Sequence, residues 1–281
     1  MQQVTPALRL WIVAQAQAGH APEAVLEAMR ASGWQEDVAL QALEDTLSGF
    51  VAEHAPAAGL PLPVAVPQPV PAGSASWLDA GDRRVRVLAT MRSPQVVVFG
   101  GLLSDEECDG IIALARPRVT RSETVRAETG GSEINSARTS SGMFFERSAN
   151  TLCARIEARI ARLVAWPLEN GEGLQVLHYL PGAEYKPHHD YFDPDKAGTP
   201  AILQRGGQRV ATLVMYLNTP EQGGATTFPD VGLEVAPIKG NAVFFSYNRP
   251  HPITRTLHGG APVVAGEKWV ATQWLRERRF E

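Results

Sequence analysis

From Gly173 to the C-terminus, the sequence alternates between short apolar runs, rich in β-branched and aromatic residues, and turns that contain glycine. The runs cover residues 174–180, 210–217, 242–247 and 268–275. The turns between them include Gly206–Gly207, Gly223–Gly224, Gly240–Asn241 and Gly259–Gly260. Many short strands joined by glycine-rich turns are typical of a β-sandwich or barrel. This pattern predicts a jelly roll for the C-terminal part of the chain.

The region before Gly173 adds helices and a strand to this core. Residues 95–99 (QVVVF) form a β-branched run, and Ser104 with Glu107 makes a capping box at the start of a helix. Apolar residues at helical spacing over 152–163 predict a second helix, which ends before Pro167. We therefore expect an α+β fold over residues 77–281, with a double-stranded β-helix (jelly-roll) core and flanking helices.

Residues 1–55 read as a separate small helical module. Gly19 and Gly33 mark the ends of the first two of three short helices, and a bundle of this size is marginal by itself. The module resembles the ubiquitin-associated three-helix type, and a packing or dimerisation appendage is the alternative. Residues 56–76 hold prolines at 56, 61, 63, 67, 69 and 71. Such a segment favours polyproline II and predicts a semi-rigid linker.

Composition argues against several classes of protein. The formal net charge is −4, from 26 basic and 30 acidic residues, which gives no electrostatic footprint for nucleic acid. The apolar runs are too short to cross a membrane, and the N-terminus lacks the basic region of a signal peptide. Cys108 and Cys153 fall on predicted helices, where burial as free thiols is expected. We therefore expect a cytoplasmic protein.

The sequence His188-His189-Asp190 is the first sign of chemistry. On a strand, residues i and i+2 point the same way, so His188 and Asp190 share a face. An imidazole and a carboxylate on one face can hold a divalent metal if a distant residue supplies a third ligand. His251 and His258 are the candidates. A triad of two histidines and one carboxylate, with open positions, is diagnostic of non-haem iron(II) oxygenases.

Several motifs in order resemble the prolyl 4-hydroxylase family of Fe(II)/2-oxoglutarate-dependent dioxygenases. The resemblance covers about residues 94–276. Its motifs are FGGLLSDEECDGIIALARPR (99–118), RTSSGMFFER (138–147), LQVLHYLPGAEYKPHHD (174–190), GGQRVATLVMYLN (206–218), GGATTFP (223–229) and LHGGAPVVAGEKWVATQW (257–274). The N-terminal module and the proline-rich segment lie outside it. The resemblance implies the bacterial type of this family, similar to the catalytic domain of the α-subunit.

The resemblance also implies a role for individual residues. His188, Asp190 and His258 correspond to the iron ligands, which favours His258 over His251. Lys268 corresponds to the lysine that binds the distal carboxylate of 2-oxoglutarate. Residues that correspond to further contacts are Tyr179 and Thr226 for 2-oxoglutarate, and Tyr185 and Arg209 for the peptide substrate. Ordinary packing or a surface ion pair is the alternative for Tyr185 and Arg209.

The activity that the resemblance implies is hydroxylation of peptidyl proline at C4, coupled to decarboxylation of 2-oxoglutarate to succinate. The cofactors would be Fe(II), 2-oxoglutarate and O2, with ascorbate as a further candidate. Residues 119–137 and 192–205 are predicted loops that would close over a substrate. A further hypothesis is that the proline-rich segment docks into the active-site groove as autoinhibitor or self-substrate, and a spacer is the alternative.

Two other functions remain open at this stage. The same chemistry could act on another side chain or on a free amino acid. A chain of a different class would be a protein-binding adaptor, in which residues 1–55 bind a partner and the β-domain is a scaffold. An intact triad together with Lys268 argues against the adaptor.

Overall fold

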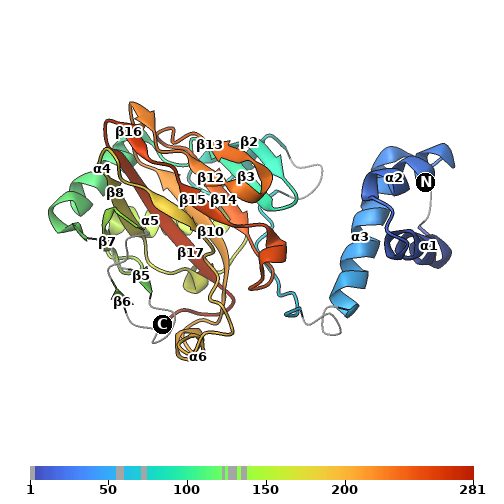
Figure 1. Ribbon diagram of the computed structural model, residues 1–281. Helices are drawn as coiled ribbons and strands as arrows, with labels where there is room; N and C mark the ends of the chain where they lie inside the picture. The colour runs from blue at the N-terminus through green and yellow to red at the C-terminus, as the bar shows by residue number, and fades with distance from the viewer. Residues whose placement is uncertain (1–3, 55–59, 71–74, 122–123, 126–131, 134–137) are drawn as a thin grey trace. The chain divides into compact units, whose positions relative to one another are not determined.

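The chain divides into a helical unit, Met1–Pro63, and a larger unit, Val64–Glu281, which holds the β-sheets (Figure 1). The computed structural model describes residues 4–54, 60–70, 75–121, 124–125, 132–133 and 138–281. The boundary between the units falls inside the proline-rich segment that the sequence predicted to be a linker over 56–76.

The helical unit consists of α1 (Pro6–Gln17), α2 (Pro22–Ala31) and α3 (Glu36–His54). Thr5 caps α1, because its hydroxyl accepts a hydrogen bond from the Leu8 amide, and Pro6 follows at the first helical position. The helices share a small core of buried residues: Ile12, Val25, Met29, Ala39, Ala42 and Leu43. The three helices lie where the sequence predicted them.

In the described residues, the larger unit is built on a nine-stranded antiparallel sheet with the order β1-β2-β3-β14-β10-β17-β8-β7-β4. Its strands are β1 (Trp77–Asp79), β2 (Arg84–Met91), β3 (Gln95–Gly100), β4 (Thr120–Arg121), β7 (Ser141–Phe144), β8 (Gln175–Tyr179), β10 (Arg209–Tyr216), β14 (Ala242–Ser246) and β17 (Lys268–Arg276). The runs that the sequence predicted as strands at 95–99, 174–180, 210–217, 242–247 and 268–275 are therefore confirmed.

A smaller antiparallel sheet with the order β13-β12-β15-β9 has four strands in the described residues. These are β9 (Tyr185–His188), β12 (Thr226–Phe228), β13 (Leu233–Val235) and β15 (His258–Gly260). Two-stranded pairs are formed by β11 (Gln222–Gly223) with β16 (Val263–Ala265), and by β5 (Thr124–Val125) with β6 (Ser132–Glu133). The helices of this unit are α4 (Asp105–Ala115), α5 (Thr151–Leu163) and α6 (Thr199–Leu203), with single 3-10 turns at Arg116–Arg118, Leu168–Asn170, Pro229–Val231 and Pro252–Thr254.

The central strands are buried on both faces, which explains why their sequences are almost continuously apolar. On β14, Ala242 and Phe244 belong to the core that includes residues of α4 and α5. The alternating residues Val243 and Phe245 belong to a second core, which includes Phe228 and Val235 of the smaller sheet. The larger sheet therefore lies between a helical layer and the smaller sheet, and this second interior holds the site described below.

Two caps fix the helical layer. Ser104 and Glu107 form the predicted capping box at the start of α4. Asn150 caps α5 by accepting a hydrogen bond from the Cys153 amide. Inside this layer, Arg159 of α5 binds both Glu107 and Asp82, and the short loop that bears Asp82 is thereby tied to α4.

The structure corrects two sequence predictions about local conformation. Strand β9 ends at His188, so Asp190 lies in a bend after the strand and not on it. The predicted loop at 192–205 contains the helix α6. The predicted loop at 119–137 holds the two-residue strands β4, β5 and β6, while its residues 122–123, 126–131 and 134–137 lie outside the described residues.

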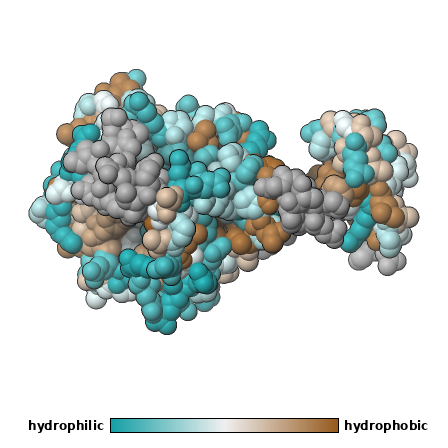
Figure 2. Space-filling model, turned by 60° about the horizontal axis from the view of Figure 1, so that its bottom comes forward, coloured by the Kyte–Doolittle hydropathy of each residue, from teal (hydrophilic) through white to brown (hydrophobic). Residues whose placement is uncertain are grey.

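The surface of the larger unit is mostly hydrophilic on the face that Figure 2 brings forward, with hydrophobic residues in scattered patches. Within the described residues, we find no helix that combines the length and the apolar character needed to cross a membrane.

The proline-rich segment continues as part of the larger unit from Val64 onward. The Val64 amide donates to the Asn248 carbonyl over 2.7 Å, and the Gln68 and Gln95 side chains bond to one another. Pro67 and Pro69 are buried. These hydrogen bonds and the two buried prolines bind residues 64–70 to the body of this unit, so this part of the segment is not a free spacer.

Replacing both Pro67 and Pro69 by Gly should destabilise the larger unit. The change removes two buried rings and increases the entropy of the unfolded chain, so the free energy of unfolding should fall by about 3 kcal/mol. The measurement is differential scanning calorimetry, in which the larger unit gives the transition of larger enthalpy. The matched control is Pro61→Gly with Pro63→Gly, two partly exposed prolines before the boundary, which should leave that transition unchanged. Equal transitions for both variants would contradict the prediction.

Candidate metal centre and its cavities

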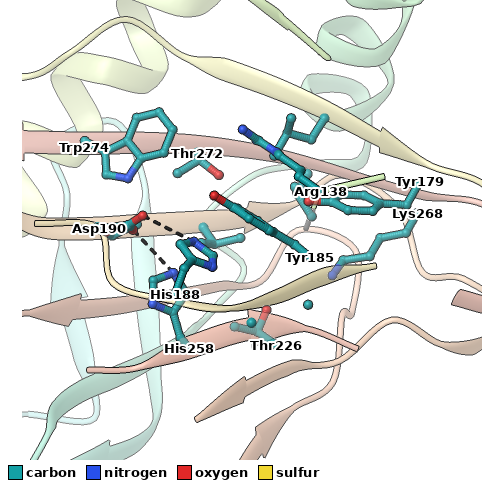
Figure 3. Close-up of a pocket in the computed structure, with 16 residues that line it drawn as sticks. Arg138, Tyr179, Tyr185, His188, Asp190, Thr226, His258, Lys268, Thr272 and Trp274 are labelled. Carbon is teal, nitrogen blue, oxygen red and sulfur yellow. Dashed lines mark hydrogen bonds and ion pairs between the residues drawn. The ribbon is translucent and has the colours of Figure 1, made fainter. Parts of the chain in front are cut away.

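The antiparallel pairing of β15 with β9 brings two histidines together. His258 and His188 are direct partners in this ladder, and their ring centroids are 4.3 Å apart. A Cβ at Gly259 would lie 2.8 Å from the Tyr185 carbonyl oxygen, so only glycine permits the two strands to approach this closely. The chain after β9 then bends and turns the Asp190 carboxylate toward the same point (Figure 3).

Ligand atoms of His188, Asp190 and His258 all lie within 4.8 Å of one another. His188 Nε2 is 3.5 Å from Asp190 Oδ1, and His258 Nε2 is 3.4 Å from Asp190 Oδ2. This is the triad that the sequence predicted. His251, the other candidate, lies elsewhere: its ring nitrogen accepts a hydrogen bond from the Ile253 amide and caps a 3-10 turn.

Backbone carbonyls fix the orientation of both imidazole rings. His188 Nδ1 lies 2.9 Å from the Lys186 carbonyl oxygen, and His258 Nδ1 lies 3.0 Å from the Thr256 carbonyl oxygen. A carbonyl can only accept, so Nδ1 carries the proton in each ring and Nε2 keeps its lone pair. Both lone pairs then face the carboxylate, which is the arrangement that metal-binding histidines adopt.

The electrostatics of the triad favour a bound cation. Burial lowers the pKa of His188, and the neighbouring His258 lowers it further, so the His188 ring is neutral. Burial alone would raise the pKa of Asp190, whereas positive charge beside the carboxylate, on the imidazole of His258 or His188 or on a bound cation, holds it well below its usual range. Neutral imidazoles and an ionised carboxylate are the protonation states that bind a metal. The donor set therefore fits Fe(II), and equally other divalent ions with the same ligand preferences.

Lys268 lies in the same cavity as the triad. It is opposite Tyr179 in the ladder of β17 with β8, and its Nζ lies 5.3 Å from the centroid of the Tyr179 ring. The residue is only 4% exposed. Within the part of the chain that the structure describes, no hydrogen bond or ion pair reaches this ammonium group, and burial lowers its pKa to about 8. A buried cation of this kind is costly unless an anion binds it.

The lining of the inner cavity includes the triad, Lys268, Tyr179 and Thr226. Thr226 accepts a hydrogen bond of 2.8 Å from the Tyr216 hydroxyl, which leaves the proton of the Thr226 hydroxyl available to a ligand. The sequence placed Tyr179 and Thr226 beside Lys268, and the structure puts all of them on this cavity (Figure 3).

A larger outer cavity opens from the first. The two cavities share five lining residues: Arg138, Tyr185, His188, Asp190 and Trp274. Tyr185 stands between them. Its ring stacks on His188 with centroids 3.7 Å apart. The guanidinium carbon of Arg138 lies 4.8 Å from the centroid of the Tyr185 ring. The outer cavity therefore ends at the metal-binding residues.

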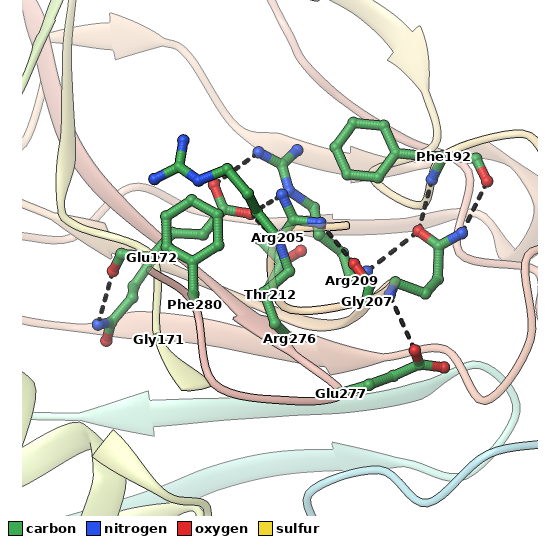
Figure 4. A network of polar contacts seen from close by, with 12 residues as sticks. Gly171, Glu172, Phe192, Arg205, Gly207, Arg209, Thr212, Arg276, Glu277 and Phe280 are labelled. Atoms are coloured by element: carbon green, nitrogen blue, oxygen red, sulfur yellow. Dashed lines mark hydrogen bonds and ion pairs between the residues drawn. The ribbon is translucent and has the colours of Figure 1, made fainter. Parts of the chain in front are cut away.

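Arg209 also lines the outer cavity, but its guanidinium already has a partner. Its Nε and Nη2 bind the two oxygens of the Glu172 carboxylate over 2.7 and 2.9 Å, and Arg276 binds the same carboxylate (Figure 4). The guanidinium lies 3.8 Å from the centroid of Trp274, the residue it covers. Of the two residues predicted to contact a substrate, Tyr185 is at the junction of the cavities and Arg209 is fixed in the wall of the outer cavity.

Sequence reasoning missed four residues of the site: Arg138, Thr212, Tyr247 and Trp274. Thr212 donates a hydrogen bond to Asp190, and Tyr247 lies next to Thr212. A signal existed for Thr212 and Trp274, because alternation along a strand puts Thr212 on one face with Tyr216, and Trp274 on one face with Lys268. Arg138 opens the motif at 138–147, but the motif does not show that the bridge to Tyr185 and the hydrogen bond to Gln175 bring this residue to the cavity.

Comparisons with known proteins agree with this geometry. Residues 174–276 match the 2OG-Fe(II) oxygenase superfamily. Prolyl 4-hydroxylase 5 of Arabidopsis thaliana is 40% identical over 222 residues, which cover 72% of this chain and 74% of the relative. Prolyl 4-hydroxylase 1 of the same plant is 45% identical over 206 residues, which cover 66% and 70%.

A solved structure is similar as well. The viral collagen prolyl hydroxylase from Paramecium bursaria Chlorella virus-1, in its complex with 2OG, is 31% identical. The match covers 64% of this chain and 95% of the viral chain, with a TM-score of 0.51.

Replacing His188 or His258 by Ala should remove a divalent ion from the site. Each change deletes one of three ligands, so the dissociation constant for Co²⁺, titrated into metal-free protein and followed by calorimetry, should rise by about 100-fold or more. His251→Ala is the matched control, since that ring caps a turn outside the triad, and it should keep the affinity of the unchanged protein. Tight Co²⁺ binding by His258→Ala would show that the triad is not the metal site.

Proposed function

Because the chain belongs to the prolyl 4-hydroxylase family of 2OG-Fe(II) oxygenases, we propose that it hydroxylates proline in peptides at C4. The reaction consumes 2-oxoglutarate and O2 and yields succinate, CO2 and the hydroxylated proline. The observation that carries the proposal is the inner cavity, where the triad and a buried lysine, which has no ion-pair partner among the described residues, face one space that opens to a larger cavity.

Each part of the inner cavity has a task in this reaction. His188, Asp190 and His258 would hold Fe(II), which when bound supplies the redox chemistry that couples 2-oxoglutarate oxidation to hydroxylation. Lys268 would bind the distal carboxylate of 2-oxoglutarate, with the hydroxyls of Thr226 and Tyr179 as further donors. The low exposure of Lys268 keeps water from competing for this ion pair, which makes the pairing stronger than it would be at the surface.

The outer cavity is the proposed route of the peptide. It reaches the triad past Tyr185. Tyr185 would contact the target proline, since its ring covers His188. Arg209 would act from the wall as a rigid group, because Glu172 already fixes its guanidinium. The segment 192–205, which contributes Phe192, Lys196 and Ile202 to the lining, is the described part of the chain placed to close over a peptide.

Other parts of the proposal concern the chain as a whole. The two sheets of the larger unit support a jelly-roll fold, which the likeness to the viral hydroxylase also favours. Ascorbate is the proposed reductant that returns the iron to the ferrous state. Cys108 and Cys153 are free, buried thiols, which supports a cytoplasmic location; fractionation of cells with an antibody would test it.

For the helical unit we propose a protein-binding role of the ubiquitin-associated type. It exposes Leu10, Trp11 and Leu40, large apolar side chains that a partner would cover. Turnover of short peptides should then be the same when Trp11 is replaced by Ser, while turnover of the intact protein substrate should fall. Equal effects on both would contradict a docking role.

The function itself predicts peptide-dependent turnover. With Fe(II), 2-oxoglutarate and ascorbate, proline-rich peptides should stimulate succinate formation and gain one oxygen on proline, with one succinate for each hydroxyl group. The measurement is mass spectrometry of peptide and succinate together. Succinate without peptide modification would keep the oxygenase chemistry and point to another side chain or a free amino acid as substrate. No succinate from metal-loaded protein would refute the enzyme.

The pKa of Lys268 predicts how 2-oxoglutarate binding depends on pH. Burial lowers this pKa to about 8, whereas a bound carboxylate raises it, so the protonated lysine binds tightly and the neutral one does not. Affinity should be constant below pH 8 and should weaken above it, by up to about tenfold for each pH unit. The measurement is the dissociation constant of 2-oxoglutarate for the Mn²⁺-loaded protein between pH 7 and 9.5.

Two variants separate the lysine from other titrating groups. Lys268→Arg keeps its charge throughout this range and should flatten the pH dependence. Lys268→Met should raise the dissociation constant by about 100-fold at pH 7, with no further change as the pH rises. A pH dependence that survives in Lys268→Met would show that another group causes it.

A further inference from the structure

A chain of two buried hydroxyl groups ends on the metal-binding carboxylate. The Thr212 hydroxyl donates to Asp190 Oδ2 over 2.7 Å, and the Tyr247 hydroxyl lies 3.0 Å from Thr212 Oγ1. An ionised carboxylate only accepts hydrogen bonds, so the single proton of the Thr212 hydroxyl points to Asp190. Tyr247 must then donate to Thr212. The chain therefore runs in one direction, from Tyr247 through Thr212 to Asp190.

Both hydroxyl groups are held firmly by their surroundings. Thr212 is 1% exposed and Tyr247 is 2% exposed. The backbone of Thr212 is fixed on both sides, because β10 pairs with β14 and with β17. The ring of Tyr247 packs against Tyr191 and Phe245, with centroids 6.0 and 6.3 Å away. The two groups therefore have little freedom to turn away from the carboxylate.

Asp190 needs such support more than the two histidines do. The rings are fixed by the backbone carbonyls of Lys186 and Thr256, whereas Asp190 lies in a bend beyond the end of β9. Among the described residues, Thr212 is the one hydrogen-bond donor to this carboxylate, because both histidines turn their unprotonated Nε2 toward it. Without this bond, the carboxylate could rotate about its Cβ–Cγ bond.

We propose that Thr212 and Tyr247 are positioning residues of the metal centre, which hold the Asp190 carboxylate in the orientation that lets it share an ion with His188 and His258. Outer hydrogen bonds of this kind commonly change metal affinity by about 10–100-fold. The inference rests on the metal role proposed for the triad, but it does not depend on the identity of the substrate.

The experiment is a titration of metal-free protein with Co²⁺, followed by calorimetry and visible absorption, without 2-oxoglutarate. Thr212→Val removes the hydroxyl at nearly constant volume and should raise the dissociation constant by about 10–100-fold. Thr212→Ser keeps the hydroxyl and should restore most of the affinity. Tyr247→Phe removes only the outer hydroxyl and should weaken binding by about tenfold or less.

The double variant tests the direction of the chain. If Tyr247 acts through Thr212, Thr212→Val with Tyr247→Phe should bind Co²⁺ no more weakly than Thr212→Val alone. Additive losses would show that Tyr247 acts by another route and would overturn the relay. Thermal unfolding of each metal-free variant shows whether the fold is intact, and a loss of affinity without a loss of melting temperature separates positioning from general destabilisation.

Tyr216→Phe is the crossed control. Tyr216 lies on the same face of β10 as Thr212, but its hydroxyl donates to Thr226 at the other end of the cavity. Its removal should weaken the binding of 2-oxoglutarate and leave Co²⁺ affinity unchanged. If Thr212→Val keeps the wild-type Co²⁺ affinity, or if Thr212→Val and Thr212→Ser lose affinity equally, the positioning role is refuted and the metal role of the triad is not affected. If the wild-type protein binds no Co²⁺, the metal role proposed for the triad is refuted as well.

Discussion

The pairing of β15 with β9 is the interaction on which the site depends. It places His258 directly opposite His188, and this register fixes which residues of the two strands face each other. Both histidines use a backbone carbonyl two residues earlier to orient the ring, so the same local conformation that forms the ladder also sets the tautomer. A one-residue shift of this register would turn one of the two rings to the opposite face of the sheet. A sequence that binds a metal here must therefore also pair β15 with β9 in this register.

The burial of Lys268 shows why the larger sheet must be covered on both faces. A lysine with its ammonium group in an apolar interior lowers stability until an anion arrives. The surrounding core, with Trp269 and Val270 as its neighbours on β17, is extensive enough to tolerate this cost. The same burial excludes water from the proposed ion pair, which is what gives the lysine its selectivity for a carboxylate over solvent. Burial of Lys268 therefore lowers the stability of the ligand-free protein while it strengthens the binding of a carboxylate.

Much of the site could be predicted from the sequence because the motifs that resemble the prolyl 4-hydroxylase family are short and local. His188, Asp190, His258, Lys268 and Thr226 each lie within a recognisable run, and the structure brings all of them to one cavity. The contacts that could not be predicted join segments far apart in the chain. Arg138 reaches Tyr185 through an isolated bridge, and Tyr247 reaches Asp190 only through Thr212.

The proline-rich segment illustrates the same limit. Its composition predicts polyproline II but carries no information about what the segment contacts. The bonds from Val64 to Asn248 and from Gln68 to Gln95 depend on the positions of β3 and β14, which the sheet decides. The described residues of this segment line neither cavity, so its contacts favour a structural role over that of a self-substrate.

The position of Arg209 in the wall of the outer cavity depends on a shared ion pair. Arg209 and Arg276 both bind Glu172, so two buried guanidinium groups share one carboxylate. Burial lowers the pKa of Arg276, and Arg209 lowers it further, although Glu172 opposes both effects. Such an arrangement is stable only because the carboxylate receives charge-assisted hydrogen bonds from both sides. Removing Glu172 would leave two like charges buried side by side, and the position of Arg209 in the cavity wall therefore depends on a residue that no peptide would contact.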